Sequence, residues 1–272
     1  MSRWRVIQAG IVTPKGNAST LDAPAVLLQH FGPVDENGTS VTVPFDRSLS
    51  MERAAYLSCE LIHRAVEEAL KAGQRPLLLG GECSLMAGSL SAALERIPKL
   101  CLAFFDAHGD FNTPQTSPSQ YLGGMCFAHV CGLSSGRLPW RAASAFPGDR
   151  ALLVGGRDLD PGERANLQQA GVLRIDPSAK DALERLIEAI GRAPLWIHVD
   201  LDVVDPSENF AVSHPAPGGI SFERLGSLLH GLARNSDIRG IEICGYQPAI
   251  DTNRSLPGRI AATFSPLLGL GR

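Results

Sequence analysis

No run of apolar residues in this 272-residue sequence is long enough to cross a membrane, because a spanning helix requires about 20 of them in succession. The apolar stretch near the N-terminus, MSRWRVIQAGIV, is too short and too polar for a secretion signal. A membrane-spanning protein and a secreted protein are therefore both disfavoured. We expect a cytoplasmic protein.

The sequence also lacks a strong excess of charge of either sign. Its 25 Lys and Arg residues nearly balance its 28 Asp and Glu residues, which gives a formal net charge of −3. A nucleic acid or a membrane surface is therefore not an expected partner.

The cysteines lack the spacing of a redox motif or a structural zinc site. There are six of them, scattered along the chain with no CxxC pair. We expect Cys59, Cys101, Cys126 and Cys131 to be reduced core residues rather than a disulfide framework. Cys83 lies in a different context, described below.

Short apolar runs alternate with amphipathic stretches along the whole chain. The runs predict buried strands at 4–9, 76–80, 101–105, 151–155, 172–175, 195–201 and 239–244. The stretches between them predict helices at 51–72, 84–96, 122–133, 161–170, 179–191, 221–235 and 254–269. Such alternation is typical of an α/β protein whose parallel sheet is covered on both faces. We expect a single domain over residues 1–272.

Two acidic clusters each follow a predicted buried strand. The first contains Asp106, His108 and Asp110, and the second contains Asp200 and Asp202. The carboxyl ends of parallel strands border the ligand crevice, and alternate residues of an extended segment share a face. Carboxylates with one imidazole suit Mn²⁺ or a similar divalent ion. Capping aspartates at strand-to-helix turns are the alternative, although two such clusters disfavour it.

Three segments together resemble the arginase/agmatinase ureohydrolases: GGECS at 80–84, DAHGDFNTP at 106–114 and HVDLDVVDP at 198–206. The similarity extends from about residue 75 to residue 250. It implies a three-layer α/β/α fold with a central, mostly parallel sheet. It also implies two manganese ions and hydrolysis of a guanidino group by a hydroxide bound to them.

The resemblance also implies a set of metal ligands. Asp106 and Asp200 would bridge both ions and hold the hydroxide. Asp110 would complete one metal position, and His108 and Asp202 the other.

A further part of the resemblance concerns the amino-acid end of the substrate. Asn112 and Ser119 match residues that bind an α-carboxylate, while Asp160 and Glu163 in RDLDPGE match residues that bind an α-amino group. Without the resemblance, DLDPGE is an ordinary helix start with Pro161 in its first turn. The match favours an L-arginine-like amino acid over agmatine, which has no carboxylate.

The chain departs from the family pattern at Cys83, which replaces a metal-binding histidine. Thiolates are soft ligands and Mn²⁺ is a hard ion, so this position should hold its ion weakly. Cys83 could ligate as a thiolate, since a nearby metal lowers the pKa of a thiol. The alternative is that Cys83 is not a ligand.

A second departure is Gly123, which replaces a loop histidine that serves as a proposed proton shuttle in arginases. Its loss should slow arginine hydrolysis by about 10²–10⁴-fold, the usual contribution of a general acid. His214 is the better-placed substitute, both as a substrate contact and as a catalytic group, although a lone loop histidine is often just solvent-exposed. His129 is a weaker candidate because it lies in a predicted helix.

A third departure concerns the acid that binds the guanidinium. Arginases place a glutamate three residues before a proline, and the position three before Pro248 is Gly245. Glu242 is the nearest acid and is the candidate for this contact. The alternative places Glu242 at a strand end elsewhere.

These departures favour a modified substrate over plain arginine. An N-hydroxyl group lowers the basicity of a guanidine, which relaxes the need for a carboxylate partner, and its oxygen can approach a weakly held metal ion. We expect hydrolysis of N-hydroxy-L-arginine to hydroxyurea and L-ornithine. At the Cys-for-His exchange the sequence is similar to the branch of the family that serves D-cycloserine biosynthesis.

Three alternatives stay open: an ordinary arginase, a hydrolase of another guanidino acid, and a catalytically inactive relative that binds an amino acid. In each case the expected partner is a small guanidino amino acid. Because family members are commonly trimers or hexamers, a homo-oligomer also stays open.

Overall fold

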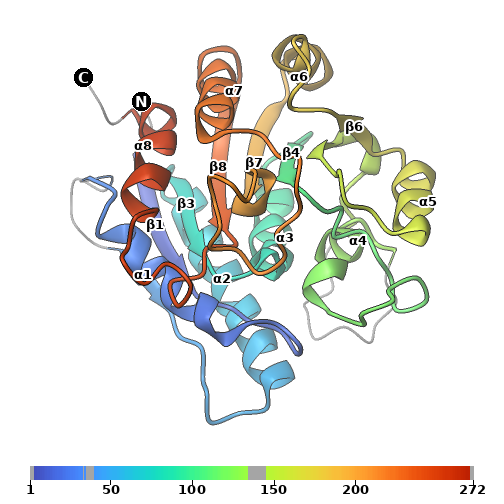
Figure 1. Ribbon diagram of the computed structural model, residues 1–272. Helices are drawn as coiled ribbons and strands as arrows, with labels where there is room; N and C mark the ends of the chain where they lie inside the picture. Colours follow the sequence, from blue (N-terminus) through green and yellow to red (C-terminus); the bar gives the residue numbers. More distant parts are fainter. Residues whose placement is uncertain (1–2, 33, 35–39, 134–144, 270–272) are drawn as a thin grey trace.

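A computed structural model describes residues 3–32, 34, 40–133 and 145–269; the other residues of the expected domain over 1–272 lie outside this description. Eight strands form one sheet in the order β2-β1-β3-β8-β7-β4-β5-β6, and every pair is parallel. The strands are β1 (Trp4–Ala9), β2 (Val41–Val43), β3 (Arg75–Gly80), β4 (Cys101–Asp106), β5 (Ala151–Gly155), β6 (Leu173–Ile175), β7 (Pro194–Asp200) and β8 (Asp237–Cys244) (Figure 1). The predicted α/β class and parallel sheet are confirmed.

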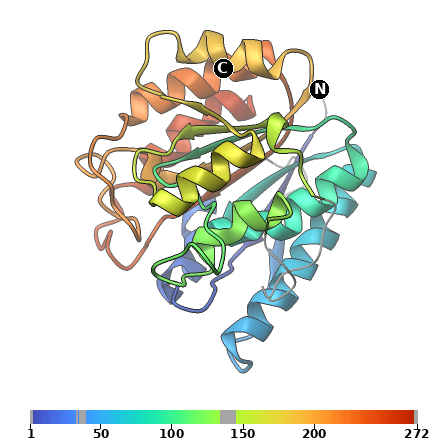
Figure 2. The same ribbon diagram turned by 90° about the vertical axis from the view of Figure 1, so that its right-hand side faces the viewer.

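Helices cover both faces of the sheet (Figures 1 and 2). They are α1 (Ala23–Leu28), α2 (Met51–Lys71), α3 (Met86–Arg96), α4 (Cys126–Val130), α5 (Pro161–Ala170), α6 (Ala182–Ile190), α7 (Phe222–Asn235) and α8 (Pro257–Leu268). The helix predicted over 122–133 is wrong in length, because a 3₁₀ turn at Gly123–Met125 precedes the short α4. No helix among the described residues is long and apolar enough to cross a membrane.

Alternation along the strands divides the interior into two apolar cores. On β4, Ala103 and Phe105 face the core under α1, α6, α7 and α8, whereas Leu102 and Phe104 face the core under α2, α3, α4 and α5. The central strands are buried on both faces, which is why they read as continuous apolar runs rather than alternating ones.

The order of the strands places the acidic clusters beside each other. After β3 the chain crosses to β4, runs outward through β5 and β6, and then returns to fill the space between β3 and β4 with β7 and β8. Ligands of open α/β sheets bind where the strand order diverges in this way. The carboxyl ends of β3, β4, β7 and β8 therefore form the floor of the candidate site.

Candidate metal and substrate site

The first cluster begins where β4 ends. Asp106 is the last residue of β4 and is 1% exposed, and its Oδ1 accepts a hydrogen bond of 2.7 Å from the backbone N–H of His108. The imidazole of His108 turns toward Asp202, with its Nδ1 2.9 Å from Asp202 Oδ2. Asp202 Oδ1 accepts a hydrogen bond of 3.0 Å from the backbone N–H of Ala107. The two clusters therefore meet through direct contacts.

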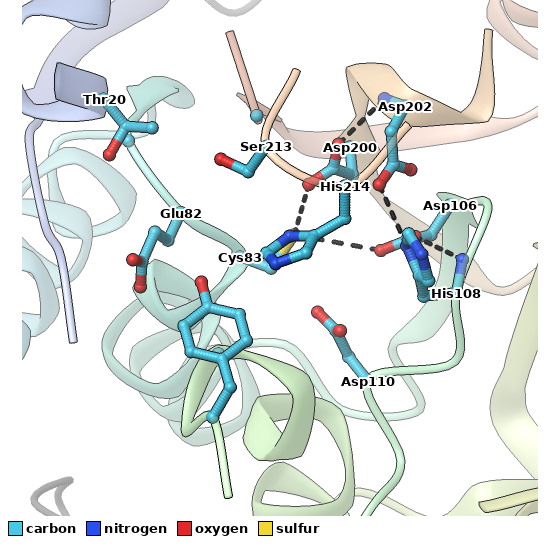
Figure 3. Close-up of a pocket in the computed structure, with 14 residues that line it drawn as sticks. Thr20, Glu82, Cys83, Asp106, His108, Asp110, Asp200, Asp202, Ser213 and His214 are labelled. Atoms are coloured by element: carbon cyan, nitrogen blue, oxygen red, sulfur yellow. Dashed lines mark hydrogen bonds and ion pairs between the residues drawn. The ribbon is translucent and has the colours of Figure 1, made fainter. Parts of the chain in front are cut away.

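The second cluster begins where β7 ends, at Asp200. One carboxylate oxygen of Asp200 accepts a hydrogen bond from the backbone N–H of Asp202 at 2.8 Å. The other lies 3.0 Å from the thiol sulfur of Cys83, which follows β3 in a short 3₁₀ turn (Figure 3). The same sulfur lies 3.8 Å from Asp106 Oδ2.

Two groups of potential metal ligands share Asp106. In the group of Cys83, Asp106 and Asp200, and in the group of Asp106, His108 and Asp202, the donor atoms lie within 4.8 Å of one another. The structure thus brings together five of the six residues expected to hold metal.

Asp110, the sixth, lines the same pocket but belongs to neither group. Its backbone has a φ of 49°, in the left-handed region, which non-glycine residues rarely occupy. Its carboxylate accepts a hydrogen bond from the thiol of Cys126 at 3.4 Å, and its backbone carbonyl accepts one from Phe127 N–H at 3.0 Å. The start of α4 thus fixes this strained residue in place.

The electrostatics of the cluster call for added positive charge. Burial, reinforced by the neighbouring carboxylates, raises the pKa of Asp200 and that of Asp202 to about 6. Burial likewise raises the pKa of Asp110 well above its usual range, with Asp106 as the next contributor. Burial lowers the pKa of His108, but its contacts with Asp106 and Asp202 outweigh this effect and raise it to about 12.

One imidazolium therefore faces four carboxylates, of which three are buried and that of Asp200 is partly buried. Charges buried with too few partners are costly, and a divalent cation would relieve the repulsion. Carboxylate oxygens with an imidazole also form a donor set that suits Mn²⁺. The residues present fit the metal that the sequence implies.

The pocket has a narrow inner part and a wider outer part. The inner part, of about 40 Å³, reaches Cys83 and the carboxylates, while the outer part, of about 330 Å³, opens beside them. They share the lining residues His108, Asp110, Tyr121 and His214. A cavity of this size is in the range that accepts small organic ligands.

The residues expected to bind the amino-acid end all line the outer part: Asn112, Ser119, Asp160 and Glu163. The Asn112 amide donates to Asp160 Oδ2 at 2.9 Å. Lys15, which the sequence reasoning missed, also lines this part, and its ammonium group donates to the Ser119 carbonyl at 2.6 Å. No motif marked Lys15, because it lies about a hundred residues before Ser119.

Glu163 also has a structural role. Its Oε1 accepts a hydrogen bond of 2.9 Å from Phe111 N–H and its Oε2 one of 3.3 Å from Asp160 N–H, which caps α5. It is 3% exposed, and burial raises its pKa to about 7. DLDPGE is therefore a helix start, as its sequence predicts, and Glu163 within it also lines the pocket.

The expectation that Glu242 contacts the substrate does not fit the structure. Its side chain is fully buried inside the fold and lines neither part of the pocket. Its carboxylate accepts hydrogen bonds from Trp196 Nε1 at 2.8 Å and from Ser89, and lies 2.5 Å from His198 Nδ1. Glu242 is two residues before the end of β8 and so lies below the pocket floor.

Packing explains two of the departures in the sequence. At Gly123, an added Cβ would collide with the ring and hydroxyl of Tyr121, so Tyr121 fills the space that a histidine there would need. At Gly245, which has a φ of 89°, an added Cβ would collide with the carboxylate of Asp200. An acid at position 245 is therefore excluded.

His214 lies at the junction of the two parts of the pocket. It is exposed, and its ring centroid lies 6.1 Å from that of His108 and 5.4 Å from that of Tyr121. His129 belongs to α4 and lines neither part.

Glu82 and Tyr121 line the inner part and were not predicted as site residues. Glu82 Oε2 accepts hydrogen bonds from the Thr13 N–H at 3.0 Å and hydroxyl at 2.9 Å. The Tyr121 hydroxyl lies beside the carboxylate, and yet Oε1 accepts no hydrogen bond within the described part of the chain. Glu82 could have been identified from the sequence as a site residue, because it directly precedes Cys83.

Comparisons with known proteins agree with this geometry. The sequence model of the arginase family matches residues 14–265. The N(omega)-hydroxy-L-arginine amidinohydrolase of Streptomyces lavendulae is 31% identical over 195 residues, covering 71% of this chain and 68% of that protein. The arginase of Bacillus caldovelox is 27% identical over 234 residues, covering 82% of this chain and 78% of that protein.

The native structure of that arginase at pH 5.6 superposes with a TM-score of 0.89 and 22% identity, covering 100% of this chain and 99% of the arginase chain. The class is thus a hydrolase of amidino groups, a ureohydrolase. The chain belongs to the arginase family, whose members are typically manganese-dependent.

Proposed function

We propose that this amidinohydrolase acts on N-hydroxy-L-arginine and yields hydroxyurea and L-ornithine. The observation that carries the proposal is the thiol of Cys83 at 3.0 Å from Asp200, in a ligand position where ordinary arginases have histidine. The relative from Streptomyces lavendulae, which bears the name of this activity, supports the same substrate. D-cycloserine biosynthesis, the pathway that such an activity would serve, stays a prediction.

Two Mn²⁺ ions are the proposed cofactors. Asp106 would serve both positions, since it belongs to both ligand groups, and Asp200, which contacts Cys83, would be the second shared ligand. His108 and Asp202 would complete one position, and Cys83 with Asp110 the other. When bound, such ions lower the pKa of a water molecule and so supply the nucleophile for attack on the guanidino carbon.

The outer part of the pocket supplies the proposed contacts for the amino-acid end. Asn112 and Ser119 carry neutral polar groups suited to a carboxylate, and Lys15 adds a positive charge at the same rim. Asp160 and Glu163 are the acids that would receive the ammonium group. Because Glu163 is buried and Asp160 is only partly buried, Asp160 is the more accessible of the two.

Glu82 is the proposed partner for the guanidino nitrogens, in place of Glu242. A buried acceptor without a hydrogen bond is destabilising by about 1–3 kcal/mol, and Glu82 Oε1 is such an acceptor in the described structure. An N–H of the substrate would satisfy it. Tyr121, whose hydroxyl lies beside this carboxylate, closes the same end of the pocket.

Hydrolysis requires a proton for the leaving amine. Water adds to the guanidino carbon, the bond from that carbon to the ornithine Nδ breaks, and Nδ takes up a proton. His214, at the junction of the inner and outer parts, is the proposed donor.

An ordinary arginase is the second candidate, since the arginase of Bacillus caldovelox matches a larger share of this chain. The two are separated by measuring ornithine release from both substrates with Mn²⁺ supplied. We expect N-hydroxy-L-arginine to be strongly preferred. A preference for L-arginine would instead make the chain an arginase that tolerates Cys83 and Gly123.

A further inference from the structure

His198 is a buried histidine with no part in the proposed reaction. It lies on β7 two residues before Asp200, is 0% exposed, and stacks on Phe104 with ring centroids 4.5 Å apart. Its Nδ1 lies 2.5 Å from Glu242 Oε2. Since Trp196 Nε1 and the Ser89 hydroxyl hold the other oxygen of Glu242, the orientation of the imidazole is fixed.

The second nitrogen of this imidazole faces two thiols. His198 Nε2 lies 3.4 Å from Cys244 Sγ, which lies 3.3 Å from Cys83 Sγ. All three residues are buried, and their donor atoms lie within 4.8 Å of one another. Cys83 Sγ is in turn 3.0 Å from Asp200 Oδ2, so the group adjoins the carboxylate centre.

We propose that Cys83, Cys244 and His198 form a three-ligand site for a thiolate-preferring ion such as Zn²⁺, with the fourth position left to water. This inference rests on the proposed function only in that Cys83 also belongs to the proposed manganese centre. Thiolates with an imidazole favour zinc, whereas the carboxylates and imidazole of Asp106, His108 and Asp202 favour manganese. When a thiolate-preferring ion occupies this site, Cys83 is no longer available to the second manganese position. The loaded centre then holds one ion on the thiolates and one manganese ion at Asp106, His108 and Asp202.

The geometry of the group fits a tetrahedral ion. With zinc–sulfur bonds of about 2.3 Å and zinc–nitrogen bonds of about 2.1 Å, neighbouring donors lie roughly 3.6–3.8 Å apart. The separations from Cys83 Sγ to Cys244 Sγ and from Cys244 Sγ to His198 Nε2, 3.3 and 3.4 Å, are a few tenths of an ångström shorter. Small outward movements of the side chains would therefore admit the ion, which can enter through the inner pocket that Cys83 lines.

The contact between Glu242 and His198 strengthens this interpretation. Metal-binding histidines usually donate their second ring N–H to a carboxylate, which fixes the tautomer and makes the ligand more basic. A proton on His198 Nδ1, directed at Glu242, leaves the lone pair of Nε2 facing Cys244. The buried Glu242, which has no contact with the substrate pocket, then has a role as the residue that positions this ligand.

The test uses Co²⁺ as a spectroscopic probe of the reduced, metal-free protein. Bound cobalt should show thiolate-to-metal charge transfer and the visible bands of a tetrahedral ion, and added Zn²⁺ should abolish both. Because one of two thiolates is lost, Cys244→Ser should reduce the charge-transfer absorbance to about half. Cys101→Ser, a buried thiol at the far end of β4, is the matched control and should leave it unchanged.

Equal charge-transfer absorbance in the wild type and in Cys244→Ser would overturn the proposal, as would its absence from the wild type. Glu242→Gln gives a second route that keeps both thiols. It should weaken Zn²⁺ binding by about 10–100-fold, the usual effect of losing such a partner, and leave Mn²⁺ binding unchanged. Unaltered zinc affinity in Glu242→Gln would also contradict the assignment.

The hydrolysis assay is independent of these readouts. Activity on N-hydroxy-L-arginine without thiolate absorption would refute the zinc site alone. Thiolate absorption without that activity would refute the proposed substrate alone.

Discussion

Replacing Asp200 with asparagine should stabilise the metal-free protein while abolishing its stabilisation by Mn²⁺. Asp200 is partly buried beside Asp202, and loss of solvation is the main reason that its pKa rises from the ordinary 3.8 to about 6. Asparagine has nearly the same shape and can still accept the hydrogen bond from the Asp202 N–H, but it carries no charge. The variant therefore separates the repulsion in the empty site from the ability to bind an ion.

The magnitude follows from the shift in pKa. A tenfold change in proton affinity corresponds to about 1.4 kcal/mol, so a rise from 3.8 to about 6 makes the ionised carboxylate destabilising by about 3 kcal/mol at pH 7. A raised pKa in an acid means that the folded state favours the proton. The metal-free wild type should therefore lose stability as pH rises from about 4 to about 6 through this group, and the Asp200→Asn variant should lose less.

The assay is urea unfolding of both proteins, with and without Mn²⁺. We expect the metal-free variant to be more stable than the metal-free wild type, and only the wild type to be stabilised by the ion. Asp205→Asn is a control of opposite sign, because hydrogen bonds from Ser207 and from the Gly218 and Gly219 N–H groups lower the pKa of Asp205. If Asp200→Asn is less stable than wild type without metal, the reasoning from buried charge is wrong.

Three further predictions concern the pocket. Cys83→His should raise Mn²⁺ content and turnover of L-arginine, as seen by metal analysis and ornithine release; no change in either would place residue 83 outside the metal centre. Asn112→Ala should raise KM for N-hydroxy-L-arginine by about 10–100-fold with a smaller effect on kcat, since it removes a hydrogen bond to a charged group; a loss confined to kcat would argue against this contact. His214→Ala should lower kcat by about 10²–10⁴-fold if it supplies the proton, whereas unchanged kcat and pH profile would exclude that role.

The order of strands and helices could be read from the sequence because most strands are buried on both faces. The runs before Asp106 and Asp200 contain almost no polar residue, so length and flanking residues identified them. The strand β2 was missed because its three residues are partly exposed and give no run. The helix α1 was missed inside a stretch expected to be irregular, since six residues are too few to show helical spacing.

Within the site, residues close together in the sequence were the easier ones to place. Asp106 and His108 follow one strand end, and the parallel sheet brings Asp200 beside them. Contacts between segments far apart in the sequence could not be predicted, and the contact between Lys15 and Ser119 is an example. No local sequence pattern indicates such a contact.

Glu242 and His198 show a different limit. Both lie inside apolar strand sequences, and the direction of a strand side chain depends on its register with its neighbours. His198 is paired with Glu242 in the register of β7 and β8, so the two meet below the pocket. Alternation along β7, which places His198 on the same face as Asp200, was the available signal.

Ornithine release from L-arginine and N-hydroxy-L-arginine, measured side by side with Mn²⁺ supplied, decides between the two substrates. We predict a kcat/KM at least tenfold higher for the hydroxylated substrate, which corresponds to about 1.4 kcal/mol in favour of its transition state. Equal values, or a preference for L-arginine, would contradict this prediction.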